Sequence, residues 1–314
     1  MRPDRARING EGLRHVGVPY DSEDAYVRLV VPRVRTALTE GRRVLVIACP
    51  DNLDRLTDAL GRDAGHVDRR VAASWYAHPY RTVAALHDYT RGRRTLVVGE
   101  PVWEGRSERE VRELIRHESV LNAALAPYAA LLFCMYDLRR APPAALEYRE
   151  ANHPLLLDAA GETPSAGFVP PGELVLSGDR APLPDPGPGA VTIRFTAREL
   201  RRLRHSVGEW ARTAGMVDAL VTSLVISVSE IAANSVEHGA GFGTITMWND
   251  GGELICEIAD PGGALDDPLP GYIPPEPESP RGYGLWISRQ LCDLVELRAE
   301  GGVLRVRLHL SLGA

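Results

Sequence analysis

The stretch Ser229-Glu-Ile-Ala-Ala-Asn-Ser-Val-Glu-His-Gly239 decides how the C-terminal part of this chain folds. It completes an apolar pattern that starts at Met216 and repeats every three or four residues, which predicts a long helix over 216–238. Glu230 and Asn234 are one turn apart on the polar face of that helix. Gly239 follows where a helix-ending glycine is expected.

Two further clusters follow this helix along the chain. Asp260-Pro-Gly-Gly263 comes directly after an apolar run over 254–259 that predicts a strand. A carboxylate at a strand end can accept a hydrogen bond from an exocyclic amine such as that of adenine, and glycines let the backbone approach a flat ring. Arg281-Gly-Tyr-Gly284 opens a predicted helix over 284–293, where free backbone N–H groups can hold phosphate oxygens. Each of these clusters alone is also typical of an ordinary turn or loop. The interpretation as a nucleotide site therefore depends on the order of the clusters along the chain.

That order resembles the GHKL (Bergerat-type) ATPase domain over residues 191–314: a helix with E-x-x-x-N, a strand ending in D-x-G, a loop, and G-x-G opening a helix. The compact size, and residues 198–210 of a helix predicted over 197–214, are similar to those of the anti-sigma-factor serine kinases. The resemblance implies a two-layer α/β sandwich that uses ATP and Mg²⁺ as cofactors. It also implies site roles: Glu230 as catalytic base, Asn234 as ligand of ATP-bound Mg²⁺, Asp260 with Gly262 at adenine, and Arg281, Gly282 and Gly284 at the phosphates.

The partners implied by this resemblance are a sigma factor and an anti-sigma-factor antagonist of the STAS type, phosphorylated on Ser or Thr. Two alternatives stay open. A histidine-kinase-like sensor would need a phosphoacceptor on a dimerising helical hairpin, and His205, the nearby candidate, lacks such a flanking pattern. An ATP-dependent binding protein without phosphotransfer would not need Glu230, so this carboxylate favours an enzyme.

The first half of the chain alternates short apolar runs with helical patterns. Residues 43–49, 95–99 and 129–136 read as buried strands, and 107–126 reads as a helix with Ser107 as its N-cap. Strands that alternate with helices predict a parallel sheet covered on both faces, a three-layer α/β domain.

Several pieces of this half are similar to the MEDS sensory domain, which is related to RecA/KaiC-like folds and precedes bacterial kinases and regulators. The pieces are His15-Val-Gly-Val-Pro-Tyr20, Glu118-Ser-Val-Leu-Asn122, Cys134-Met-Tyr-Asp137 and His153-Pro154. Ligands of open α/β sheets bind at the carboxyl ends of strands. We therefore expect a pocket for a small-molecule or redox signal lined by His15, Tyr20, Cys134, Tyr136 and Asp137.

We divide the chain into a MEDS-like domain over 1–165, a Pro/Gly-rich linker over 166–190, and the ATPase-like domain over 191–314. The linker assignment rests on 181–189, a run rich in Pro and Gly that cannot form a regular element. Because such a linker is semi-rigid, it could transmit the orientation of one domain to the other.

Composition excludes several classes of protein. The chain has 314 residues, a formal net charge of −6 and no lysine, so a P-loop or a eukaryotic-type kinase site is excluded as usually built. The acidic balance argues against direct nucleic-acid binding. No apolar run is long enough to span a membrane, and the polar N-terminus does not resemble a secretory signal. We therefore expect a cytoplasmic protein, which could form a homodimer. The four cysteines form no CxxC pair, so their spacing indicates neither a zinc site nor a disulfide framework.

Overall fold

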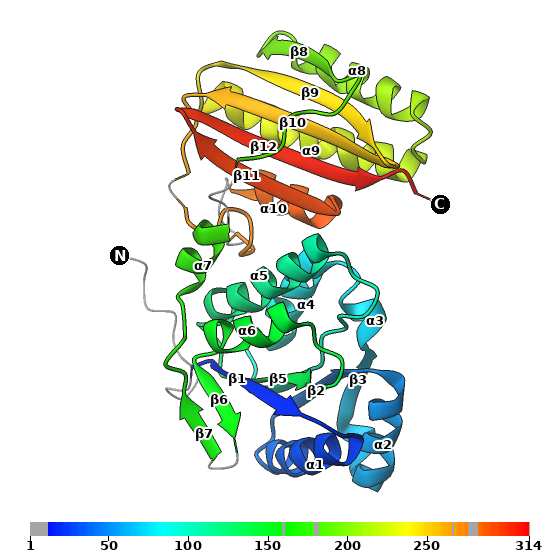
Figure 1. Cartoon of the computed structure of the whole chain (residues 1–314), viewed down its shortest axis with the longest axis vertical. Coiled ribbons are helices and arrows are strands. Elements are labelled where there is room, and N and C mark those ends of the chain that lie inside the picture. Colours follow the sequence, from blue (N-terminus) through cyan, green and yellow to red (C-terminus); the bar gives the residue numbers. More distant parts are fainter. Residues whose placement is uncertain (1–11, 159–160, 179–181, 266, 276–281, 314) are drawn as a thin grey trace. The chain divides into compact units, whose positions relative to one another are not determined.

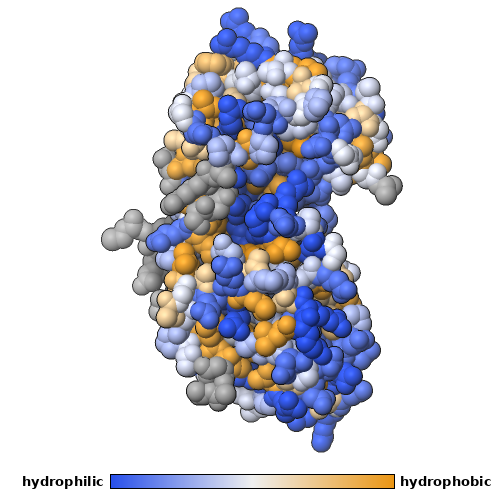
Figure 2. All heavy atoms as spheres, in the orientation of Figure 1, coloured by the Kyte–Doolittle hydropathy of each residue, from blue (hydrophilic) through white to orange (hydrophobic). Residues whose placement is uncertain are grey.

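The computed structural model describes residues 12–158, 161–178, 182–265, 267–275 and 282–313 (Figure 1). Contacts within the chain divide it into two compact units, Met1–Leu174 and Val175–Ala314. Hydrophilic residues cover much of the face seen in Figure 2, with hydrophobic residues interspersed among them.

The N-terminal unit is built on a seven-stranded sheet of order β3-β2-β4-β5-β1-β6-β7. Neighbouring strands are parallel except for β7, which runs antiparallel to β6. The expected strands at 43–49, 95–99 and 129–136 are confirmed as β2, β4 and β5. The strands are β1 (Arg14–Tyr20), β2 (Arg43–Ala48), β3 (Val67–Val71), β4 (Thr95–Gly99), β5 (Ala130–Asp137), β6 (Leu155–Asp158) and β7 (Gly161–Pro164).

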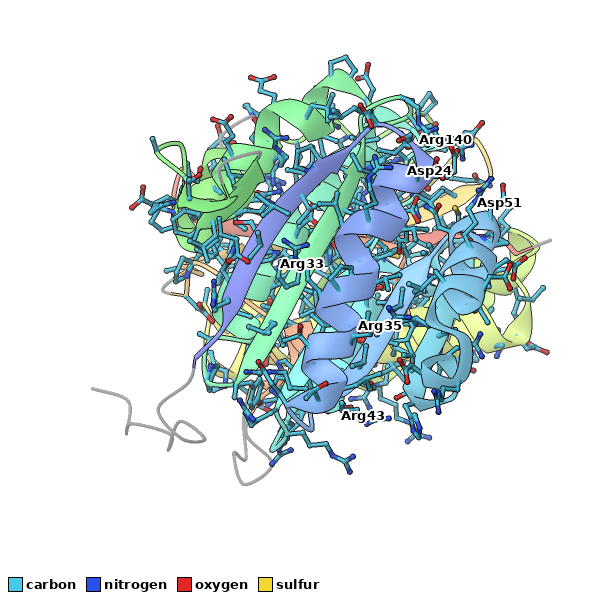
Figure 3. The ribbon with its side chains drawn as sticks, turned by 90° about the horizontal axis from the view of Figure 1, so that it is seen from below. Asp24, Arg33, Arg35, Arg43, Asp51 and Arg140 are labelled. Carbon is cyan, nitrogen blue, oxygen red and sulfur yellow. The ribbon has the colours of Figure 1, made fainter. Side chains whose placement is uncertain are left out.

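Helices cover both faces of this sheet, so the expected three-layer parallel-sheet domain is confirmed. On one face, Tyr26 and Val30 of α1 and Leu56 of α2 pack in a core with β1, β2, β4 and β5, and Figure 3 looks onto these two helices. On the other face, side chains of α4 and α5 line a small cavity together with Val97 and Leu132 of the sheet. The helices are α1 (Glu23–Thr39), α2 (Pro50–Leu60), α3 (Ala72–Trp75), α4 (Pro79–Thr90), α5 (Glu108–Ala124) and α6 (Pro143–Asn152), with a 3-10 turn at Gly61–His66.

The start of α5 follows the expected capping pattern. The Ser107 side chain accepts from the backbone N–H of Glu110, at 3.3 Å, and the Glu110 carboxylate accepts from the backbone N–H of Ser107, at 2.8 Å. This reciprocal arrangement satisfies donors that the first helical turn leaves free.

The segment 166–190 is not wholly irregular. It contains a short helix, α7 (Pro171–Gly178), opened by hydrogen bonds from the N–H groups of Glu173 and Leu174 to Pro170 O. Residues 182–190 carry no helix or strand. They nevertheless contact the C-terminal sheet, because Arg307 donates to Pro184 O at 2.7 Å.

The C-terminal unit is a five-stranded antiparallel sheet of order β11-β12-β10-β9-β8 with helices on one face. This confirms the expected two-layer sandwich. The helix expected from residue 197 begins later, at Leu200, after Thr196 N–H donates to Glu199 Oε2. The elements are β8 (Val191–Thr196), α8 (Leu200–Thr213), α9 (Asp218–Glu237), β9 (Phe242–Asp250), β10 (Glu253–Pro261), α10 (Tyr283–Leu291), β11 (Leu294–Glu300) and β12 (Val303–Ser311).

Helix α9 is the central helix of this unit, in contact with both α8 and α10. Its residues Val221, Leu224, Val228 and Ile231 are buried in the core that the helices form with the sheet. Within the described residues, α9 alone is long and apolar enough to cross a membrane by composition. Its burial against the sheet is what the core helix of a globular domain shows.

Candidate functional site

A cleft of about 740 Å³ opens in the C-terminal unit between the end of α9, the end of β10 and the start of α10. This volume lies in the range of small-molecule sites. The three sequence clusters, far apart along the chain, meet at this cleft. Its lining includes Glu230, Asn234, Ser235, Gly239, Asp260, Gly263, Asp267, Gly271, Gly282, Tyr283 and Gly284.

The polar face of α9 borders the cleft beside Gly284. A Cβ built at Gly284 would stand 3.0 Å from Asn234 Nδ2 and 3.4 Å from Glu230 Oε2. Glu230 is half-buried and Asn234 is exposed. The absence of a side chain at residue 284 therefore keeps space open next to the carboxylate and the amide.

Asp260, the penultimate residue of β10, lines the cleft and is 6% exposed. Burial raises the pKa of its carboxyl group, and hydrogen bonds from Ala240 N–H and from Ser235 partly offset this effect. The Ala240 N–H donates to Asp260 Oδ1 at 3.3 Å. Ser235 lies one residue after Asn234 and is buried. We had not singled it out from the sequence, because a lone serine within a helical pattern gives no sign of a contact with a distant strand.

The start of α10 forms the third side of the cleft. Gly282 is the N-cap, with φ of +94°, a left-handed conformation that favours glycine. Gly262 also has a positive φ, +96°, and its N–H donates to Gly302 O at 2.8 Å. Arg281 lies outside the described residues.

Arg289 of α10, which we had not singled out from the sequence, ties residues 270–272 to the helix. Its Nε donates to Pro270 O at 3.0 Å, and its guanidinium lies 3.7 Å from the ring centroid of Tyr272. Nearby, Gly271 packs so tightly on α10 that a Cβ there would stand 2.7 Å from Leu285. Residues 270–272 are thereby held beside the cleft.

These residues fit an adenine nucleotide. Asp260 offers a buried acceptor, Asn234 offers an amide oxygen of the kind that Mg²⁺ prefers, and the α10 N-terminus offers N–H groups for phosphates. The absence of a side chain at Gly284 leaves room beside Asn234 and Glu230.

The sensory pocket expected in the N-terminal unit is divided between two polar clusters. In the first, His15 contacts Cys134 Sγ at 3.1 Å, and Tyr136 donates a short hydrogen bond to Glu118. His153 stacks edge-on against His15, with centroids 4.3 Å apart. Burial lowers the pKa of His15 to about 4 and raises that of Glu118 to about 6.

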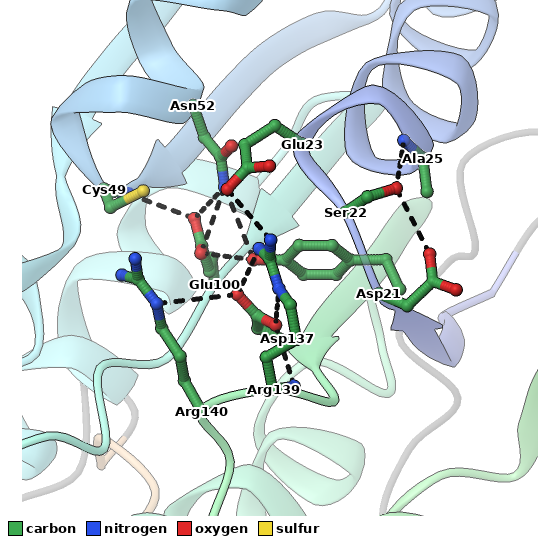
Figure 4. A network of polar contacts seen from close by, with 11 residues as sticks. Asp21, Ser22, Glu23, Ala25, Cys49, Asn52, Glu100, Asp137, Arg139 and Arg140 are labelled. Atoms are coloured by element: carbon green, nitrogen blue, oxygen red, sulfur yellow. Dashed lines mark hydrogen bonds and ion pairs between the residues drawn. The ribbon is translucent and has the colours of Figure 1, made fainter.

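The second cluster lies at the carboxyl ends of β1, β2 and β4 (Figure 4). Tyr20 donates to Glu100 Oε1 at 2.6 Å, Asn52 Nδ2 donates to both carboxylate oxygens at 3.1 Å, and Cys49 N–H donates to Glu100 Oε2 at 3.0 Å. Burial and the negative charge of Glu100 raise the pKa of Tyr20. Glu100 was missed from the sequence, although a carboxylate directly after a buried strand is a detectable signal.

Asp137, at the end of β5, lies beside Tyr20 in the strand register. Arg139 donates to both of its carboxylate oxygens at 2.8 Å and to Glu23 at 2.9 Å (Figure 4). Burial would raise the pKa of Asp137, but the hydrogen bonds and charge of Arg139 hold it below the usual value. Asp137 is thus already engaged in an ion pair.

Comparison with solved structures finds the RsbU and RsbW domains of Rv1364c from Mycobacterium tuberculosis, at 18% identity and a TM-score of 0.30. That match covers 41% of this chain and spans about a third (32%) of the other. No curated protein matches the chain.

Two family models match, one for each unit. Residues 14–154 match MEDS, the MEthanogen/methylotroph, DcmR Sensory domain. Residues 193–308 match the histidine kinase-like ATPase domain, and this range includes all the described residues that line the cleft. The chain therefore carries an N-terminal MEDS domain followed by a histidine kinase-like ATPase domain.

Proposed function

We propose that the C-terminal unit binds Mg·ATP in its cleft and transfers the γ-phosphate to a Ser or Thr hydroxyl of another protein. The observation that carries this proposal is the convergence of Glu230 and Asn234, one turn apart on α9, with Asp260 and Gly284 at one cleft. A carboxylate beside a metal-binding amide, a buried acceptor for adenine and a helix N-terminus for phosphates together make a phosphotransfer site.

The proposed chemistry is positioning with one proton transfer. Asn234 would hold the Mg²⁺ that neutralises phosphate charge, and the α10 N–H groups would hold the phosphate oxygens. Glu230 would accept the proton of the attacking hydroxyl as its oxygen bonds to the γ-phosphorus, and ADP would leave. Asp260 would accept from the adenine amine and so select ATP over GTP.

The partners in this proposal are a sigma factor, held by the C-terminal unit, and a STAS-type antagonist as the phosphate acceptor. This choice rests on the similarity of the chain's last part, with its helix after Arg198, to the anti-sigma-factor kinases. The MEDS domain would report a small-molecule or redox signal to the kinase.

A histidine-kinase-like reaction is the second candidate. His205 of α8 is exposed and pairs with Glu209 at 3.2 Å. Its helix, however, buries Leu203, Val207 and Ala211 in the core of the ATPase domain itself. An α8 held in this way does not resemble a separate dimerising hairpin, so Ser or Thr transfer is favoured.

The test is incubation of the full chain with γ-labelled ATP and candidate antagonists, followed by acid treatment. Phosphoserine and phosphothreonine survive acid, whereas phosphohistidine is lost. We expect acid-stable label on the antagonist, lowered by about 10²–10⁴-fold in Glu230→Gln with ATP binding retained. Acid-labile label on the chain itself would support the histidine-kinase reading, and ATP binding with no label on any protein would leave an ATP-dependent binding protein.

A further inference from the structure

Four side chains that commonly bind metals converge in the core of the N-terminal unit. His15 comes from β1, Glu118 from α5, Cys134 from β5, and His153 follows α6. All four are buried, and one ligand atom from each lies within 4.8 Å of the others. This cluster plays no part in the nucleotide cleft, which belongs to the other unit.

Hydrogen bonds fix the tautomer of His15. Both amide hydrogens of Asn122 are used, since its Nδ2 donates to Ser119 O at 3.0 Å and to Asn152 O at 2.7 Å. Asn122 Oδ1, 2.9 Å from His15 Nδ1, must therefore accept, and His15 Nδ1 carries the proton. The lone pair of the neutral ring is then on Nε2, which faces Cys134 Sγ at 3.1 Å.

The same reasoning applies to His153. Its Nδ1 lies 2.7 Å from Arg149 O, and a carbonyl oxygen only accepts, so Nδ1 carries the proton. Its Nε2 is buried and has no hydrogen-bond partner in the described part of the chain. The nearest acidic atom is Glu118 Oε1, at 3.9 Å. Two imidazole lone pairs thus point into one buried cluster, and a metal-binding histidine typically donates its other N–H to a carbonyl or similar acceptor in this way.

The strand next to Cys134 makes room for the second imidazole. Gly17 is the register partner of Cys134 on β1. A Cβ at Gly17 would stand 3.0 Å from Cγ and Nδ1 of His153. Any larger residue would push His153 away from the cluster.

We propose that His15, Glu118, Cys134 and His153 bind one divalent transition-metal ion of the Zn²⁺ class. His15 Nε2 to Cys134 Sγ is 3.1 Å and His153 Nε2 to Glu118 Oε1 is 3.9 Å, on either side of the roughly 3.3–3.8 Å edge of a tetrahedral zinc site. All four ligand atoms lie within 4.8 Å of one another, so side-chain shifts of about 1 Å would complete the tetrahedron. A thiolate and a carboxylate supply two negative charges that balance the ion, which makes a neutral assembly suited to burial. Imidazole and thiolate together favour Zn²⁺ and its neighbours over Mg²⁺ or Ca²⁺.

The proposal is tested on the untagged full chain, stripped with a chelator and reloaded. We expect about one Zn²⁺ retained per chain, and Co²⁺ loading should give a thiolate-to-cobalt charge-transfer band. Cys134→Ala should abolish that band, and His153→Gln should weaken Zn²⁺ binding by at least about 100-fold. Cys256→Ala, which removes a buried thiol from the other unit, is the matched control and should change neither.

Circular dichroism establishes that each variant is folded. Asn122→Ala is a further test, because it removes the hydrogen bond that keeps the proton on His15 Nδ1 but removes no proposed ligand. We expect this variant to bind Zn²⁺ about 10–100-fold more weakly. A folded chain that retains no Zn²⁺ and gives no cobalt band would overturn the proposal. So would metal binding that Cys134→Ala and His153→Gln leave unchanged.

Discussion

Gly239 lies directly against the carboxylate of Asp260: a Cβ at residue 239 would stand 2.1 Å from Asp260 Oδ2. We had expected Gly239 to be the glycine that caps the end of α9, but the cap lies one residue earlier. The helix is capped by His238 at φ of −122°, and the nearby glycine with positive φ is Gly241. Glycine at 239 instead permits the helix end and the strand end to touch, which places Asp260 in the cleft.

This contact leads to the first prediction. Gly239→Ala should displace the Asp260 side chain and weaken ATP binding by at least about tenfold, with loss of the preference for ATP over GTP. Titration of the full chain with both nucleotides measures this. Gly208→Ala on α8, where a Cβ would make only ordinary contacts from 3.4 Å, is the control and should bind normally. Unchanged nucleotide preference in Gly239→Ala would remove Asp260 from the adenine site.

The second prediction concerns the space that Gly284 leaves open beside α9. Gly284→Ala should weaken Mg²⁺-dependent ATP binding, because its Cβ would press on Asn234. Asn234→Ala should weaken it as well, and the double variant should be no worse than Asn234→Ala alone, since neighbours that act through one contact are not additive. ATP-binding constants of the unmodified chain, the two single variants and the double variant, measured with and without Mg²⁺, give the double-mutant cycle. Strict additivity would show that Gly284 acts independently of Asn234.

The third prediction is a pH dependence of stability. His309 is buried between two carboxylates, 3.1 Å from Glu253 and 3.0 Å from Glu296. Burial lowers the pKa of His309, but the hydrogen bonds and charges of the two carboxylates outweigh it and raise the pKa. Because the folded-state pKa lies above the unfolded value, this contribution is full below about pH 6.5 and is lost as pH rises through the folded-state pKa.

Comparison with His309→Gln isolates this effect. The free-energy advantage of the unmodified chain over the variant should fall as the pH rises from about 6 to about 9. Calorimetry of both proteins across that range provides the measurement. An advantage that stays constant with pH would show that His309 does not titrate in the folded protein.

The fourth prediction concerns the segment before β8. A Cβ at Gly187 would stand 2.9 Å from the ring of Trp248, and Pro184 O accepts from Arg307, which also pairs with Glu257 at 2.6 Å. Gly187→Ala should loosen the segment and expose Trp248, which is 4% exposed. We expect faster proteolysis near residues 182–190 and a red-shifted tryptophan emission. Gly65→Ala, where a Cβ meets nothing within 4 Å, should change neither.

The fifth prediction is the order of thiol reactivity. We had expected a small-molecule or redox signal to act at a pocket that includes Cys134, but Cys134 is 3% exposed, and burial raises the pKa of its thiol. Cys49 is partly exposed and is the accessible thiol among the four. A thiol reagent should therefore label Cys49 first, as mass spectrometry of the native chain can show. Labelling of Cys134 before Cys49 would mean that the N-terminal core opens readily.

Patterns confined to one element predicted much of this structure. The spacing of Glu230 and Asn234 placed both on one face of α9, because four residues make about one helical turn. Apolar runs located β2, β4 and β5, and the Ser107–Glu110 pair located the start of α5, because these signals are read within a few residues. The short helix α7 was missed because the prolines around it pointed to irregular chain.

By itself, the sequence determined the two domain types, the elements of the ATPase sandwich and the polar groups carried by its three clusters. Only the tertiary structure decided which distant residues meet. The order β4-β5-β1 sets Gly17 beside Cys134 and brings His15, Glu118 and His153 around that thiol. Cysteine spacing alone had indicated no zinc site, because a single cysteine forms no motif along the chain. Strand order is decided by packing across the whole core, and no pattern within one strand encodes which strands become its neighbours.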